Sequence, residues 1–253
     1  MNRKLFKLPF REKHTPDWNC PTCEVGLLRV DANTFVSAET RSSKLAHDHE
    51  DWDPEWIQYR FSTMLRCTND KCSDLVSLSG TGSVRYDVEF DHNGQPEDIC
   101  ADFFQPKYFE PPLKIIPIPE GCPRSVSEPL TVSFRLFFAC PSAASNSVRI
   151  ALEELLTELK IKRYVTSNGK RSLLSLHRRI ALLPSKFDEL KEVFFAIKWL
   201  GNAGSHASGE VSTDDVLDTY ELVSHLLDEV YASKSTKIKA LAKKVNKKKG
   251  PAR

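Results

Sequence analysis

Apolar side chains recur at spacings of three and four residues throughout the second half of the chain, which is typical of helices that face a core. Residues 144–159 form the longest such stripe. With its neighbours it predicts about five helices with short connections, and therefore a helical bundle. The expected helices lie at residues 130–139, about 144–159, about 173–183, about 187–201, and from about 212 onward.

The first half of the chain shows a two-residue period instead. Val84, Tyr86, Val88 and Phe90 alternate with charged residues, which predicts a strand with one apolar face. The Asn-Gly pair that follows, at residues 93–94, favours a tight turn. Residues 99–104 then fit a returning strand. This pattern predicts small antiparallel β units.

Proline separates the two patterns. Residues 105–129 contain seven of the fifteen prolines, which fix φ and bias the preceding residue away from helix. We therefore expect a linker laid along the surface. The predicted fold class is α+β, with domains at residues 1–104 (β), 105–129 (linker), 130–233 (helical) and 234–253 (basic tail).

Charge is distributed unevenly. The formal net charge is +2, but residues 234–253 hold eight lysines, one arginine and no acid, so residues 1–233 carry −7. Lysine-rich segments bind nucleic acid through its phosphates. A solvated, disordered terminus is the alternative for this tail.

Composition narrows the classes of protein. With 40% hydrophobic and 28% charged residues, the chain is unlike disordered or collagen-like proteins. No apolar run approaches the roughly 20 residues of a membrane-spanning helix. The basic N-terminus lacks the apolar stretch of a secretory signal. We therefore predict a cytoplasmic protein that does not enter a membrane.

Four of the seven cysteines form two close pairs, Cys20 with Cys23 and Cys67 with Cys72. In a reducing compartment, paired cysteines more often bind metal than form disulfides. Two such turns closing on one ion predict a zinc-ribbon-like element with structural Zn²⁺, because four cysteines leave no open coordination position. Reduced thiols without metal, or a ligand from His47 or His49, are the alternatives. The other three cysteines are expected to be buried.

A second candidate site lies near the end of an apolar-striped helix. Lys198, Asn202 and His206 are spaced four apart and share one face if the helix continues through them. A cation, an amide and an imidazole can bind a phosphate, and the histidine can transfer a proton. Alternatively, Gly201 and Gly204 end the helix.

From about Phe104 to Tyr231 the chain resembles the bacterial "domain of unknown function 4145" family, which is placed near or within the HEPN superfamily of helical domains. The resemblance runs through the proline-rich approach, residues 147–153 and residues 176–180. It is most specific at residues 200–206, Leu-Gly-Asn-Ala-Gly-Ser-His, which match the family's G-N-x-x-[AS]-H. Family members often carry a cysteine-pair zinc element upstream.

The resemblance implies a HEPN-like bundle associated with RNA or another nucleic acid. It also implies a homodimer whose two motifs form one cleft. Many HEPN domains are metal-independent endoribonucleases, some of them effectors in bacterial antiviral defence or toxin–antitoxin systems. In that reading His206 is the general acid–base and Asn202 orients the phosphate. Gly201 stands where the motif's arginine belongs, so Lys198 or Arg149 would supply the positive charge. The alternative is a non-catalytic module that binds a partner protein or nucleic acid.

Overall fold

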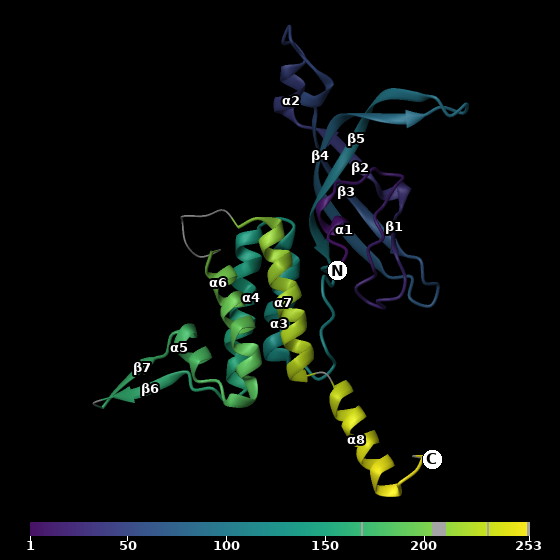
Figure 1. The fold of residues 1–253 in the computed structure, drawn as a ribbon. Coiled ribbons are helices and arrows are strands. Elements are labelled where there is room, and N and C mark those ends of the chain that lie inside the picture. Colours follow the sequence, from purple (N-terminus) through teal and green to yellow (C-terminus); the bar gives the residue numbers. More distant parts are fainter. Residues whose placement is uncertain (168, 204–210, 232, 252–253) are drawn as a thin grey trace. The chain divides into compact units, whose positions relative to one another are not determined.

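The structure is a computed structural model, drawn in Figure 1, in which the chain forms two compact units. One unit comprises residues 1–114 with 134–140, and the other comprises residues 115–133 with 141–253. The first is built around a sheet and the second around helices, which confirms the α+β class. The structure describes residues 1–167, 169–203, 211–231 and 233–251.

The first unit contains one curled antiparallel sheet of five strands rather than separate small units. Strand β3 is central, because both β1 and β2 pair with one of its edges and β4 pairs with the other. Strand β5 pairs with the far side of β4. The elements are α1 (Lys4–Lys7), β1 (Leu28–Val30), η1 (Ala32–Thr34), β2 (Val36–Glu39), α2 (Arg41–Ala46), η2 (Pro54–Trp56), β3 (Gln58–Cys67), β4 (Leu75–Phe90) and β5 (Pro96–Glu110).

Aromatic side chains fill the inner side of this sheet. The ring of Phe61 on β3 lies 5.1 Å from that of Phe104 on β5, and Phe10 packs edge-on against Phe61. Trp18 is almost fully buried, and its indole nitrogen donates to the Leu5 carbonyl at 2.6 Å. Because each large ring removes extensive apolar surface from water, these contacts dominate the stability of the unit.

The sheet curls at a bulge where the register of β4 against β5 shifts between Ser79 and Gly80. A Cβ at Gly80 would lie 2.2 Å from the Gln105 carbonyl oxygen, so only glycine allows this approach. Pro106 pairs opposite Gly80 on β5, an edge strand, where a missing N–H is tolerated. The first residues of the expected linker, 105–110, therefore lie in a strand.

The hairpin formed by the far ends of β4 and β5 corrects the expected apolar face. Val84 is buried, but Tyr86, Val88 and Phe90 are exposed, Phe90 at 72%. The alternation is real, yet these residues lie where the two strands extend without a third neighbour, since β3 pairs with β4 only as far as Ser83. The phenol of Tyr86 donates to Asp53 at 2.9 Å.

The second unit is helical, but its first helix begins earlier than expected. Helix α3 spans Arg124–Phe137 rather than 130–139, so residues 124–129 of the expected linker are helical. Leu113, Ile115 and Ile116 in that linker are buried rather than laid along the surface. The long stripe forms α4, the short helix is α5, and the last expected helix is α7. The residues of helix α3 up to Ser133 belong to this unit, whereas residues 134–140 belong to the first unit. The elements are α3 (Arg124–Phe137), α4 (Pro141–Glu158), β6 (Tyr164–Ser167), β7 (Lys170–Leu173), α5 (Leu176–Ala181), η3 (Ser185–Leu190), α6 (Lys191–Ala203), α7 (Thr213–Tyr231) and α8 (Ser233–Lys248).

One buried polar chain ties three of these helices together. Ser133 on α3 donates to the Ala144 carbonyl of α4 at 2.8 Å, and the Tyr220 hydroxyl on α7 donates to Ser133 at 2.7 Å. Burial raises the pKa of Tyr220 well above its ordinary value. Both hydroxyls in this series of hydrogen bonds have a partner. The bonds therefore fix the arrangement of the three helices without leaving an unsatisfied hydroxyl in the core.

A buried arginine joins α5 to the end of α4. Arg179 is 2% exposed, and its guanidinium donates to the Glu153 carbonyl, the Thr157 hydroxyl and the Ile161 carbonyl. These acceptors lie in the last turns of α4 and just after it, where the negative end of the helix dipole favours a cation. This contact anchors the segment that carries the hairpin of β6 and β7.

Three sequence predictions need correction. Helix α6 runs to Ala203, so Gly201 does not end it. Residues around Gly169, expected to be only a break between helices, form the β6–β7 hairpin. Cys100 and Cys140 are exposed rather than buried. In the part of the chain that the structure describes, no helix has the length and apolar character needed to cross a membrane.

Candidate functional site

The four predicted cysteine ligands meet in the first unit. The sulfur atoms of Cys20, Cys23, Cys67 and Cys72 all lie within 4.8 Å of one another. Cys23 and Cys67 are 3.6 Å apart, and Cys20 and Cys72 are 3.9 Å apart. Two of the side chains are buried and two are half-buried. A single metal ion can therefore be coordinated by all four sulfurs.

Two similar turns present the sulfurs. In the first, the Glu24 N–H donates to the Cys20 carbonyl, and in the second the Ser73 N–H donates to the Asn69 carbonyl, both at 2.8 Å. Glu24 and Ser73 each directly follow a ligand and have positive φ, 58° and 48°. Each turn thus reverses in the left-handed region immediately after its second cysteine.

The wide second spacing has a structural explanation. Asn69 occupies the position in its turn that Cys20 occupies in the first, while Cys67 lies two residues earlier, at the end of β3. The Asn69 N–H donates to the Cys67 sulfur at 3.4 Å. Four intervening residues therefore form a turn equivalent to that of the first pair.

Backbone donors and burial act on the thiols in opposite directions. The Gly26 N–H, followed by that of Val25, lowers the pKa of Cys23 to about 6. Burial raises the pKa of Cys67 to about 12. Four thiols this close cannot all ionise without strong repulsion, whereas a bound cation stabilises the thiolate form of each. The donor set therefore suits a soft metal cation.

Gly26 is a functional residue that the sequence patterns did not identify. Its N–H donates to the Cys23 sulfur at 3.4 Å. A Cβ at this position would lie 2.4 Å from the Cys67 sulfur and 2.8 Å from the Asn69 nitrogen. The only signal in the sequence was a glycine three residues after a candidate ligand.

The histidines considered as alternative ligands lie elsewhere. The His47 ring nitrogen pairs with Glu39 at 2.8 Å, and its ring packs 4.7 Å from that of Trp52. The ring of His49 packs against Trp56. Among the described residues, the only metal-competent group contains the four cysteines and neither histidine.

The second candidate site is partly assembled where α4 meets α6. A Cβ at Gly201 would lie 3.0 Å from the Arg149 Cβ and 3.5 Å from the Ser145 carbonyl oxygen. The Ser145 hydroxyl donates to the Leu200 carbonyl at 3.0 Å. The two helices therefore approach closely at Gly201, and a side chain there would require its neighbours on α4 to shift by a few tenths of an ångström.

This close approach brings two cations together. Lys198 is 7% exposed, and its ammonium lies over the Trp199 ring. Burial, followed by the charge of Arg149, lowers the pKa of Lys198. Arg149 also pairs with Glu153, four residues later on α4, at 3.1 Å.

The remaining two predicted residues are placed differently. Asn202 is half-buried, one turn after Lys198 on α6. His206 lies outside the described residues. The structure therefore brings Arg149 and Lys198 to one place on the helical unit, with Asn202 one turn along the same helix.

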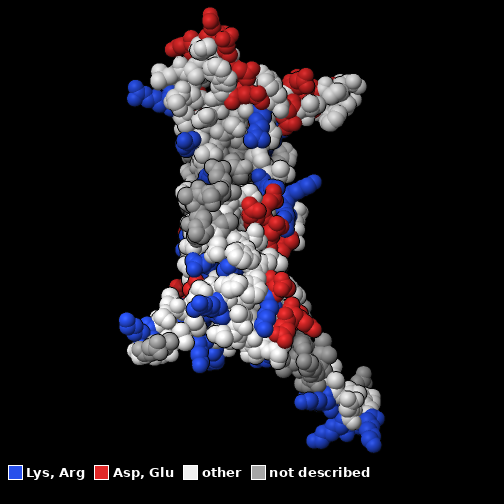
Figure 2. Space-filling model, turned by 60° about the vertical axis from the view of Figure 1, so that its left-hand side comes forward, with Lys and Arg blue, Asp and Glu red and all other residues white. Residues whose placement is uncertain are grey.

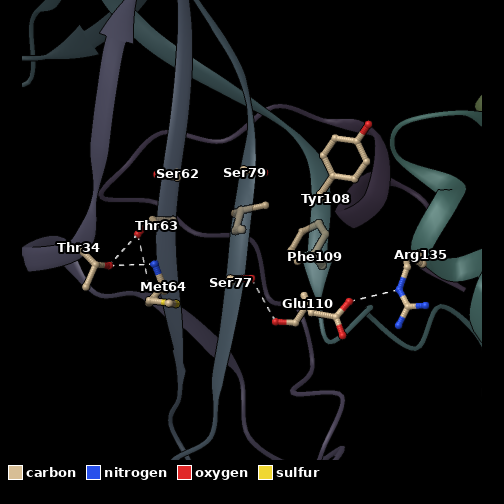
Figure 3. Close-up of a pocket in the computed structure, with 11 residues that line it drawn as sticks. Thr34, Ser62, Thr63, Met64, Ser77, Ser79, Tyr108, Phe109, Glu110 and Arg135 are labelled. Atoms are coloured by element: carbon tan, nitrogen blue, oxygen red, sulfur yellow. Dashed lines mark hydrogen bonds and ion pairs between the residues drawn. The ribbon is translucent and has the colours of Figure 1, made fainter.

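A hollow of about 410 Å³ lies on the first unit, at the ends of β3, β4 and β5 (Figure 3). Its polar groups are largely engaged with one another: Glu110 pairs with Arg135 at 3.2 Å, and Thr34 bonds Thr63 at 3.2 Å. In the described part of the chain, no histidine, cysteine or lysine lines it. We assign no chemistry to this hollow.

Comparison with known proteins divides the chain in the same way. The family described as "Domain of unknown function (DUF8608)" matches residues 8–109, which include all four clustered cysteines. The family described as "Domain of unknown function (DUF4145)" matches residues 132–248, which confirms that part of the expected resemblance. No curated protein and no solved structure matches the chain.

Gly26→Ala is expected to lower the affinity of the cysteine cluster for metal by roughly 10- to 100-fold, because the added methyl displaces a sulfur and its backbone donor. Competition with a chromophoric chelator measures this affinity. Gly121→Ala is the matched control, since a Cβ there has no neighbour closer than 3.7 Å. Wild-type affinity in the Gly26 variant would contradict the assigned role.

Proposed function

We propose that the protein is a nucleic-acid-associated binding protein in which a structural zinc ion holds the β unit together. The observation that carries the nucleic-acid part is helix α8. Its described side chains from residue 241 onward are mostly exposed, and residues 234–253 contain no acid. The exposed lysines in the described part of α8 and just after it are Lys243, Lys244, Lys247, Lys248 and Lys249. In Figure 2, Lys and Arg side chains gather in this region, at the lower right.

Such a helix suits a polyanion. Leu241 and Val245 lie on it at i,i+4 spacing and are 53% and 36% exposed. The rest of its described outer surface is formed mainly by lysine stems and ammonium groups. Lysine contacts with phosphate release counterions, and the resulting affinity is independent of sequence and sensitive to salt. We therefore expect binding to RNA without strict sequence preference.

Replacing the five exposed α8 lysines with glutamine should weaken RNA binding and flatten its salt dependence. Each lost phosphate contact removes roughly 0.7 from the slope of log K against log salt for single strands, so the change is up to about 3.5. Fluorescence anisotropy with a labelled RNA at several salt concentrations measures both quantities. The matched control replaces the same lysines with arginine, which keeps the charge. Equal affinity and slope in the glutamine variant would refute this assignment.

Zinc is the metal that best suits the cysteine cluster. Tetrahedral thiolates about 2.3 Å from zinc lie about 3.8 Å from one another, close to the observed 3.6 and 3.9 Å. Magnesium and calcium prefer oxygen ligands. With Cys20, Cys23, Cys67 and Cys72 all coordinating, no position remains for substrate, so the ion would crosslink the two turns rather than catalyse.

Purified protein should contain about one equivalent of zinc per chain, and its removal should lower the thermal midpoint of the β unit. Elemental analysis and thiol titration measure the content. Cys20→Ser should lose the metal, whereas Cys140→Ser, at an exposed thiol outside the cluster, should retain it. Less than about half an equivalent, with every thiol titrating freely, would refute the zinc assignment.

A metal-independent endoribonuclease of the HEPN type is the second candidate function. The observation that favours it is the position of Arg149, whose Cβ faces Gly201 across the α4–α6 contact. Arg149 thereby lies beside the position at which such motifs place their arginine. Together with Lys198 it would stabilise charge on a phosphate, Asn202 would orient that phosphate, and His206 would transfer the proton. In a homodimer, two copies of this group would form one cleft.

RNA cleavage in buffer depleted of divalent ions tests this candidate. His206→Ala should slow cleavage at least about 100-fold, because it removes the general acid–base. His225→Ala, at an exposed histidine of α7, is the matched control and should cleave at the wild-type rate. Equal products from wild type and His206→Ala, or none from either, would exclude the endoribonuclease and leave a non-catalytic binding protein.

A further inference from the structure

A second basic segment lies within the helical unit, away from α8. Between Leu159 and Phe187 the chain has eight cations and no acidic residue. The segment covers the hairpin of β6 and β7, helix α5 and the start of η3. The cations are Lys160, Lys162, Arg163, Lys170, Arg171, Arg178, Arg179 and Lys186.

The structure separates these cations into two groups. Arg179 is buried at the end of α4, and Arg163 pairs with Glu154 at 3.2 Å, so these two have structural partners. The exposed group comprises Lys160, Lys162, Lys170, Arg171, Arg178 and Lys186. In Figure 2, Lys and Arg side chains gather on the projecting segment at the lower left.

The β6–β7 hairpin projects as a two-stranded sheet, with no third strand among the described residues (Figure 1). Residues directly opposite in its register share a face, so Tyr164 lies on the same face as Leu173, and Thr166 on the same face as Arg171. The exposed fractions of Tyr164 and Leu173 are 44% and 67%. An isolated hairpin of this length gains little stability by itself. Contact with a ligand would cover its exposed apolar side chains and pair its cations.

One side-chain pair on this face has the geometry of a stacking platform. The guanidinium carbon of Arg171 lies 3.9 Å from the centre of the Tyr164 ring. The guanidinium lies over the phenol ring and both residues are exposed, so a flat group can approach the pair from solvent. Nucleic-acid bases stack on such guanidinium planes and on aromatic rings, particularly where they are unpaired.

Further cations and aromatics continue along the same segment. Arg178 is exposed on α5, and the His177 ring lies 6.5 Å from that of Trp199, whose side chain is 60% exposed. Cations that alternate with exposed aromatic rings are the combination with which proteins bind single strands. An acidic protein partner would use the charges but would not need the stacked pair.

We propose that the β6–β7 hairpin with α5 is a binding surface for single-stranded RNA. Lys162 and Arg178 contact phosphates, and Arg171, placed over the Tyr164 ring, stacks on a base. This inference rests on the proposed nucleic-acid association, and it assigns to the helical unit a contact surface that is separate from α8.

The test measures the anisotropy of a labelled 20-nucleotide oligouridine bound to the full chain, at several salt concentrations. The combined variant Lys162→Gln, Arg171→Gln, Arg178→Gln should raise Kd roughly tenfold or more in low salt and, because two phosphate contacts are lost, reduce the salt slope by about 1.4. The matched control removes three exposed charges from the first unit, Arg41→Gln, Lys44→Gln and Arg60→Gln, and should bind like wild type. Far-ultraviolet circular dichroism and the thermal midpoint verify that each variant is folded.

Tyr164→Leu tests the stacked pair separately. It keeps an apolar side chain and every charge, so the salt slope should stay at the wild-type value while Kd rises by about tenfold. A Tyr164 variant with unchanged Kd would overturn the stacking role. Equally strong competition by polyglutamate of matched length would show a general polyanion surface and overturn the RNA assignment.

The outcomes for the two proposals differ. If wild type binds no RNA, the nucleic-acid association fails and the hairpin surface fails with it. If wild type binds and the glutamine variant of α8 is weakened while the hairpin variant is unchanged, only the hairpin assignment is overturned. Weakening by the hairpin variant alone supports the hairpin surface and refutes the role of α8.

Discussion

Two loops that lie more than 40 residues apart in the chain meet at the sulfur atoms of four cysteines. Four thiols within 4.8 Å repel one another when ionised, and burial of Cys67 opposes its ionisation further. A bound cation would remove both penalties and would fix the turn after Trp18 against the end of β3. The aromatic core that lies beside this point would then pack around a defined chain path. Under the zinc proposal, the β unit depends on a contact that is electrostatic and coordinative as well as hydrophobic.

The helical unit depends on a different constraint, the separation of α4 and α6. Gly201 permits contact with Arg149, and the Ser145 hydroxyl fixes the two helices by bonding the Leu200 carbonyl. A side chain at position 201 would require its neighbours on α4 to shift by a few tenths of an ångström. Under the endoribonuclease proposal, the glycine that stands where the motif's arginine belongs lies against another arginine. Packing and candidate chemistry are linked at this one residue.

The positive charge is concentrated in two segments of the helical unit, which the net charge of the whole chain does not show. Residues 159–187 and 234–253 together hold seventeen cations and no acid, and both belong to the helical unit. A chain with formal charge +2 can therefore present two strongly basic surfaces. Electrostatic attraction to a polyanion acts over about a Debye length, roughly 8–10 Å, so local charge matters more than the total.

The sequence by itself determined the α+β class, the positions of the helices and the four cysteines that converge. Each of these predictions rests on local periodicity or on residue spacing within one turn. Both can be recognised in the sequence without knowing which distant segments come into contact.

Only the tertiary structure decided how those parts meet. The alternation at Val84–Phe90 indicated a strand but not that its tip would be exposed, because exposure depends on where β3 stops pairing. Likewise, Gly26 and Gly201 look alike in the sequence, and the reason for each is an atom from a distant segment, the Cys67 sulfur and the Arg149 Cβ. Periodicity records which side chains avoid water, whereas these approaches depend on how two elements pack, and that is set by the whole fold.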